Sequence, residues 1–76
     1  METTEFFARL AEIFDIPVDT ITDNRAITEE DWDSLAAMAV MAAIDEIYDV
    51  VVPVKEIVKS RTIGDLLRLV AAGKSS

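Results

Sequence analysis

The stretch Glu29-Glu30-Asp31-Trp32-Asp33-Ser34-Leu35 marks the place where a long loop becomes a helix. Asp and Ser are both good N-cap residues, and the alanine-rich segment that follows has a high helix propensity. We therefore predict a helix from about residue 33 or 34 to about Tyr48. Periodicity does not decide its buried face, because two stripes compete: Leu35, Met38, Met41 or Ala42 and Asp45, or Leu35, Ala39, Ala42 and Glu46.

Upstream of this stretch, apolar side chains recur every three or four residues between positions 4 and 14, which predicts an amphipathic helix. Asp15-Ile16-Pro17 ends it, because the residue before a proline is disfavoured in the helical conformation. A connection of about eighteen residues follows, and loops of that length in compact domains are functional or locally packed. Five apolar residues predict that this loop is ordered: Ile16, Val18, Ile21, Ile27 and Trp32.

Downstream, Val50-Val51-Val52 has no partner strand and is expected to be a packed loop. A short helical turn is expected around 55–59. A last helix starts at Thr62, with Asp65 at its capping-box position. Its apolar face is formed by Ile63, Leu66, Leu67 and Val70, and residues 73–76 are expected to be a frayed tail. The prediction is a single all-α domain, residues 1–76, with three main helices, one short helix and a long first loop.

Composition argues against catalysis by the chain itself. The 76 residues include no Cys and no His, and fifteen Asp and Glu against seven Lys and Arg give a net charge of −8. So small a domain offers no deep catalytic cavity, and it lacks a thiolate, an imidazole base and the usual zinc ligands. Asp15, Asp19 and Asp23 lack the spacing and glycine of an EF-hand, so no metal site is predicted.

The acidic charge also bears on partners and location. It disfavours nucleic acid and anionic membranes and favours a basic protein partner. The first residues lack the positive segment of a signal peptide, and no uncharged run is long enough to span a bilayer. We expect a monomeric, cytoplasmic protein that does not insert into membranes.

Asp33-Ser34-Leu35 at the start of the second helix resembles the motif of the acyl carrier protein family, in which the serine hydroxyl is esterified by 4′-phosphopantetheine. The resemblance covers nearly the whole chain. Its other elements are the long loop before Ser34, Ile44-Asp45-Glu46-Ile47-Tyr48 at the end of the helix, the Val52-Pro53 step, and Thr62-Ile63-Gly64-Asp65-Leu66 at the last helix.

The resemblance implies a four-helix carrier bundle that tethers acyl intermediates as thioesters on an arm at Ser34, with Asp33 and Leu35 as motif neighbours. A phosphopantetheinyl transferase would attach the arm from coenzyme A with Mg²⁺, so the thiol comes from the cofactor. Ser34 has no visible base and would be a modification acceptor rather than a catalytic nucleophile. From the local sequence alone Ser34 also fits a simple N-cap, and Leu35 is expected to anchor the turn in the core.

Fatty-acid carriers characteristically have acidic residues just after the Ser-Leu pair and one turn later, where this chain has Ala36 and Ala39. Because charges at an interface set partner choice, we expect partners to recognise an Ala/Met surface instead. That surface comprises Ala36, Met38, Ala39, Asp45 and Glu46. The expected partners are an acyl or aminoacyl ligase, a ketosynthase or an acyltransferase with a basic or mixed apolar patch.

We therefore predict a stand-alone acyl carrier of a specialised pathway, such as polyketide, lipid or cell-surface modification. The alternatives are a peptidyl or aminoacyl carrier and an unmodified helical interaction module.

Three side-chain roles stay open at this stage. Met38 and Met41 suit either a core or a partner-binding patch, and Met38, one turn beyond Ser34, is assigned to the patch. Trp32 is expected to tie the long loop to the helices rather than to stack on a ligand. An acyl chain could also be sequestered in a cavity lined by Met38, Met41, Ile44, Val58 and Leu66.

Overall fold

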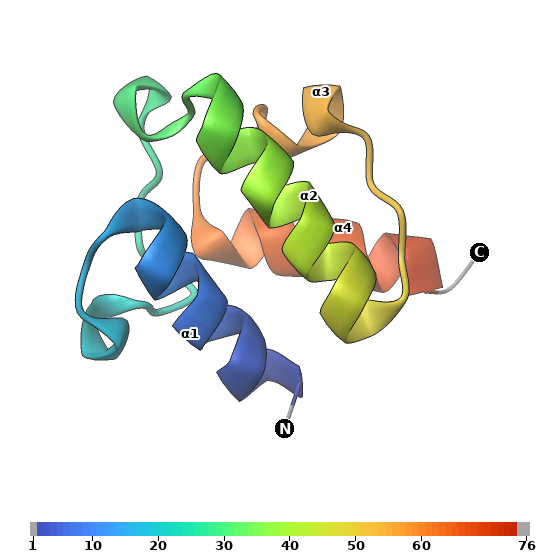
Figure 1. Ribbon diagram of the computed structural model, residues 1–76, viewed down its shortest axis with the longest axis horizontal. Coiled ribbons are helices and arrows are strands. Elements are labelled where there is room, and N and C mark those ends of the chain that lie inside the picture. The colour runs from blue at the N-terminus through green and yellow to red at the C-terminus, as the bar shows by residue number, and fades with distance from the viewer. Residues whose placement is uncertain (1, 75–76) are drawn as a thin grey trace.

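The computed structural model describes residues 2–74, except for the side chains of Glu2, Ser34 and Lys74. Its helices are α1 (Glu2–Phe14), α2 (Ser34–Tyr48), α3 (Val54–Ile57) and α4 (Ile63–Lys74). Two 3-10 turns, η1 (Val18–Thr20) and η2 (Glu29–Asp31), lie between α1 and α2 (Figure 1). No β-strand occurs among the residues described. The predicted all-α fold, with three main helices, one short helix and a long first loop, is confirmed.

Helix α1 packs alongside α2 and buries Phe6 and Leu10 completely, because residues four apart share one helix face (Figure 1). It ends as predicted at the residues before Pro17. Asp15 adopts the left-handed conformation, with φ of 57°. The N–H of Ile16 donates to the Ala11 carbonyl (3.0 Å) and that of Asp15 to the Glu12 carbonyl (3.3 Å), which forms a Schellman C-cap.

The long connection between α1 and α2 is ordered, as predicted, and buries Ile21 and Ile27. Three backbone hydrogen bonds join it to the start of α4: from the N–H of Ile27 to the Arg61 carbonyl (2.7 Å), from Ile63 to Arg25 (3.1 Å) and from Gly64 to Asp23 (2.8 Å). Val18 was wrongly predicted as an anchor. It is 53% exposed, because the η1 turn lies on the surface and buries none of its residues.

Helix α2 buries a face that neither predicted stripe describes. Val40, Ala43 and Ile44 point into the core, while the stripes that both start at Leu35 run over exposed or half-buried positions. The reason is size: Val40 and Ile44, one turn apart, bury more apolar area than the alanines between them. At the end of α2, the Tyr48 ring packs edge to face on Phe6 of α1, with ring centroids 5.5 Å apart.

The connection from α2 to α3 is the packed loop that was predicted: Val50 and Val52 are buried, while Val51 is exposed. Helix α3 begins at Val54, one residue before the predicted turn, and residues 58 and 59 form a turn after it.

The predicted capping box of α4 is confirmed. The N–H of Asp65 donates to Thr62 Oγ1 (3.2 Å), and the Asp65 carboxylate accepts from the N–H groups of Thr62 (3.3 Å) and Arg61 (2.9 Å). The predicted apolar face is confirmed as well, with Ile63, Leu66 and Val70 buried and Leu67 half-buried.

The frayed tail was placed too early, because α4 includes Gly73 and Lys74. A Cβ at position 73 would lie 2.4 Å from Val50 Cγ1, so this glycine lets the α2–α3 loop approach the last turn of α4. Residues 75 and 76 lie outside the described residues.

The residues considered as a cargo cavity do not form one continuous wall. Ile44 and Leu66 are fully buried in the core, Met41 is half-buried against it, and Met38 and Val58 are exposed. None of the described helices combines the length and apolar character needed to cross a lipid bilayer.

Candidate functional site: the start of α2

Two successive caps build the junction between the long loop and α2. In the first, Thr28 and Asp31 cap the η2 turn, because the Asp31 carboxylate accepts from the N–H (2.9 Å) and the hydroxyl (3.1 Å) of Thr28. In the second, Asp33 is extended (φ −80°, ψ 172°) and its carboxylate accepts from the N–H of Ala36 at 2.7 Å. The chain therefore enters α2 in a fixed direction.

Ser34 is the first residue of α2, as the sequence predicts, and its side chain lies outside what the structure describes. The simple N-cap alternative for Ser34 is wrong, since Asp33 is the N-cap. The physical reason is that an N-cap residue must be extended for its side chain to reach the N–H two or three residues on, whereas Ser34 already belongs to the helix.

Leu35 does not anchor this turn in the core; it is 77% exposed. The buried face of α2 runs through Ala36, Val40 and Ala43, and at about 100° per residue Leu35 falls well outside that stripe. An apolar side chain thus stands in solvent directly beside Ser34.

The predicted Ala/Met surface of α2 is only partly accessible. The prediction that Ala36 contacts partners is wrong. Ala36 is only 7% exposed, because it begins the buried stripe of α2, and it cannot present a surface to a partner. Met38 is 57% exposed and Ala39 half-buried, while Asp45 is exposed near the other end of the helix. The large exposed apolar side chains of α2 are therefore Leu35 and Met38.

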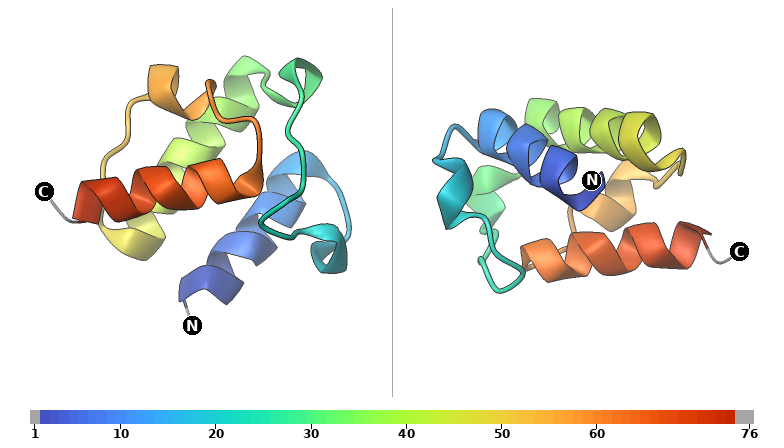
Figure 2. Two further views of the ribbon diagram at one scale, coloured as in Figure 1. Left: turned by 180° about the vertical axis from the view of Figure 1, so that it is seen from behind. Right: turned by 90° about the horizontal axis from the view of Figure 1, so that it is seen from below.

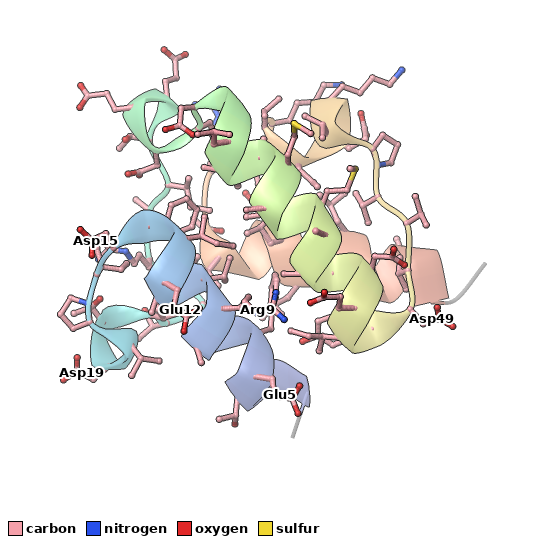
Figure 3. All side chains as sticks on the ribbon, in the orientation of Figure 1. Glu5, Arg9, Glu12, Asp15, Asp19 and Asp49 are labelled. Carbon is pink, nitrogen blue, oxygen red and sulfur yellow. The ribbon has the colours of Figure 1, made fainter. Side chains whose placement is uncertain are left out.

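Glu46, the last residue of the predicted surface, is engaged within the molecule. Arg9 extends from α1 towards α2 and forms an ion pair with the Glu46 carboxylate (Figure 3). The hydrogen bond and the charge of Glu46 raise the pKa of Arg9, with smaller effects from Glu12 and Glu5. A basic partner would have to compete with Arg9 for this carboxylate.

The carboxylates before Ser34 divide into two pairs. Asp31 and Asp33 act as caps, while Glu29 and Glu30 are exposed on the η2 turn. Among the described residues, no three acidic side chains come together closely enough to hold a metal ion.

Trp32 ties the loop to the helices, as predicted. Its ring packs edge to face on Phe14 of α1, with centroids 5.6 Å apart, and its indole N–H donates to the Ser60 carbonyl at 3.2 Å. The loop, the start of α2 and the connection from α3 to α4 thus meet at one end of the molecule (Figure 2).

A hollow of about 510 Å³ opens at this meeting point. Ile27, Trp32 and Val58 contribute apolar walls, and Lys59 and Arg61 contribute cationic side chains. Neither Lys59 nor Arg61 was predicted as a site residue from the sequence. The signal that could have found them is the uneven charge along the chain: residues 1–49 hold two Lys and Arg against thirteen Asp and Glu, whereas residues 50–76 hold five against two.

The start of α2 fits an ester-linked phosphate group. The residues on either side of Ser34, Asp33 and Leu35, are both exposed. The N–H groups of a first helical turn lack intrahelical acceptors and carry partial positive charge, which favours a nearby anion. Glu29 and Glu30 oppose that anion, so we expect the enzyme that attaches it to supply the cations.

A comparison with protein-family models supports this interpretation. The model described as "Phosphopantetheine attachment site" matches residues 5–70. No curated protein and no solved structure matches the chain. Carriers of this family are not catalysts: a phosphopantetheinyl transferase attaches 4′-phosphopantetheine to them covalently. Since the match extends over most of the sequence, the chain belongs to the phosphopantetheine attachment site family, and it is a non-catalytic carrier protein with 4′-phosphopantetheine as its cofactor.

Proposed function

We propose that Ser34 bears the 4′-phosphopantetheine arm and that the protein presents acyl thioesters on this arm to successive enzymes. The observation that carries the proposal is the position of Ser34. It is the first residue of α2, directly after the Asp33 cap, between two exposed residues, Asp33 and Leu35. The family match includes this position.

The attachment step needs a partner, because the chain itself has no His or Cys. The Ser34 oxygen forms an ester bond to the phosphorus that carries pantetheine in coenzyme A. The pyrophosphate P–O bond breaks, adenosine 3′,5′-bisphosphate leaves, and a base of the transferase takes the serine proton. The arm's thiol, when bound, then supplies the sulfur for the thioester.

The outer surface of α2 supports a carrier of a specialised pathway. Ala39 stands where a fatty-acid carrier is expected to have a carboxylate, and Glu46 is paired with Arg9. The large exposed apolar side chains near Ser34 are Leu35 and Met38. Such a surface favours partners with mixed apolar patches over strongly basic ones. A polyketide, lipid or cell-surface modification pathway is proposed, and a peptidyl or aminoacyl carrier is the alternative.

Intact-protein mass spectrometry tests the attachment. The protein is incubated with coenzyme A, Mg²⁺ and a promiscuous phosphopantetheinyl transferase, and one phosphopantetheine group should be added. Ser34→Ala should abolish the addition, whereas Ser60→Ala should not, although Ser60 is the only other serine within residues 2–74. A chain that gains no mass, or that gains it in the Ser34→Ala variant, would contradict the proposal.

The cargo class is tested on the loaded protein. Acyl ligases and aminoacyl ligases are offered the holo-protein with their own substrates, and the thioester formed is identified by mass. Loading by acyl ligases supports an acyl carrier, whereas selective loading by aminoacyl ligases would replace it with the alternative.

A further inference from the structure

The hollow beside α2 is lined by apolar residues together with polar and cationic ones. Ile27 is buried, Trp32 half-buried and Val58 exposed along its walls, while Lys59 and Arg61 are exposed on it. Its volume, about 510 Å³, is within the range of small-molecule sites. The residues on either side of the η2 turn and the α3–α4 connection supply these side chains. The η2 turn and this connection flank the first turn of α2 in the left view of Figure 2.

The part of the chain that supplies the two cations of the hollow differs in charge from the part before it. Residues 1–49 have a net charge of −11 and residues 50–76 a net charge of +3, which together give the −8 of the chain. Lys59 pairs with Glu56 at 3.1 Å on the surface, a contact that contributes little free energy. Arg61 belongs to none of the ion pairs found among the described residues. A cation is thus available in the lining of this hollow in an acidic protein.

We propose that this hollow binds the free end of a cargo that terminates in a carboxylate, so that the natural cargo is a dicarboxylic acyl group. This inference rests on the proposed attachment at Ser34. Trp32 precedes Ser34 by two residues, so their Cα atoms are separated by at most about 7 Å. An arm attached there holds its cargo near the hollow at an effective concentration in the millimolar range. The acyl chain would contact Ile27, Trp32 and Val58.

The cargo's carboxylate would form charge-assisted hydrogen bonds with Lys59 and Arg61. A single tethered carboxylate suits this hollow better than the acidic surface of a second protein. Glu29 also lines the hollow and the exposed Glu30 follows it in the chain, so a broad negative surface would be repelled from the same side. One carboxylate at the end of a chain can approach the two cations and stay away from Glu29.

A matched pair of cargoes tests the proposal. The transferase loads glutaryl-pantetheine or pentanoyl-pantetheine from the corresponding coenzyme A thioester; the two chains have equal length and differ in the terminal carboxylate. Mass spectrometry first verifies a single addition on Ser34. Nuclear magnetic resonance then follows the Trp32 indole N–H and the backbone amides of Lys59 and Arg61.

The glutaryl form should shift these three resonances relative to the pentanoyl form, and added salt should reduce the difference by screening. The double variant Lys59→Gln, Arg61→Gln should abolish it, whereas Lys55→Gln, which changes an exposed lysine of α3 outside the hollow, should preserve it. Well-dispersed amide spectra show that each variant is folded.

Equal shifts with both cargoes, no shift with either, or a difference that survives the double variant would each overturn the dicarboxylic assignment while leaving attachment at Ser34 intact. Failure to load any arm at Ser34 would instead overturn both proposals, and mass spectrometry detects it before any resonance is measured.

Discussion

The indole N–H of Trp32 and the carbonyl oxygen of Ser60 are hydrogen-bonded at 3.2 Å, although 28 residues separate them in the chain. This bond fixes the loop before Ser34 to the segment that leads into α4. Because the Trp32 ring also packs on Phe14, one side chain connects α1, the long loop and the α3–α4 connection. The position of the α2 start thus depends on a residue that precedes the carrier motif.

Trp32→Phe is expected to keep the ring contact with Phe14 and to lose the hydrogen bond to Ser60. The free energy of unfolding should fall by about 1 kcal/mol, the usual contribution of one such bond. Urea unfolding followed by far-ultraviolet circular dichroism measures the change without needing the tryptophan signal. Trp32→Ala, which removes the ring contact as well, should cost clearly more. Equal losses in the two variants would show that the ring contact contributes nothing, and an unchanged stability of Trp32→Phe would show that the hydrogen bond contributes nothing.

Ala39→Glu should make the protein a better substrate for fatty-acid elongation enzymes. Ala39 is half-buried on α2, one turn beyond Leu35, so a longer side chain there can extend into solvent. The new carboxylate would meet the basic patches of those enzymes and raise the association rate. Turnover of the acyl-loaded variant is compared with that of wild type and of Ala42→Glu, a carboxylate on an exposed position farther from Ser34. Wild-type turnover equal to that of a fatty-acid carrier would refute the specialised pathway.

Asp49→Gly should stabilise the protein. Asp49 follows α2 with φ of 58°, a left-handed conformation that costs an ordinary residue about 1 kcal/mol more than glycine. Its carboxylate also lies near the negative end of the helix dipole. Urea unfolding should show a gain for Asp49→Gly and a smaller one for Asp49→Asn, which removes only the charge. Asp15, at the other side of the molecule in Figure 3, has the same geometry. As a control, Asp45→Gly within α2 should destabilise.

The α4 capping box should make stability depend on pH. The N–H of Arg61 is the main cause that lowers the pKa of Asp65, and Arg68 adds to it, while partial desolvation opposes the shift. A carboxyl group whose pKa is lower in the folded state stabilises the protein fully above its unfolded pKa, about 4. That stabilisation is lost as the pH falls through the lower folded-state pKa. At pH 7 the free energy of unfolding should be higher for wild type than for Asp65→Asn. This difference should become smaller below pH 4. A difference that is constant with pH would contradict this assignment.

Local signals predicted most of the fold. The Thr62 and Asp65 capping box, the end of α1 before Pro17 and the start of α2 at Ser34 all follow from contacts within a few residues, so the sequence alone indicates them. The buried face of α2 does not follow, because alanines on several sides leave its periodicity weak, and tertiary packing of Val40 and Ile44 decides it. The error at Leu35 has the same origin.

In the candidate site, too, local features were predictable from the sequence and long-range contacts were not. The motif places Ser34 and Asp33 at a helix start, and the structure has them there. The contact of Trp32 with Ser60, the pairing of Arg9 with Glu46 and the cations of the hollow join residues far apart in the chain, and no local pattern predicts which distant side chains will meet. The close approach of Gly73 to Val50 also joins residues far apart in the chain.

The backbone hydrogen bonds between the long loop and the start of α4 have a consequence for biosynthesis. Asp23, Arg25 and Ile27 form backbone hydrogen bonds with residues 61–64, and Trp32 donates to the Ser60 carbonyl. A chain that grows from its N-terminus therefore exposes the Ser34 segment before the residues that hold it have been made. The loop and the first turn of α2 take their final positions only after residue 64 has left the ribosome, so recognition of the folded junction by a transferase follows translation of most of the domain.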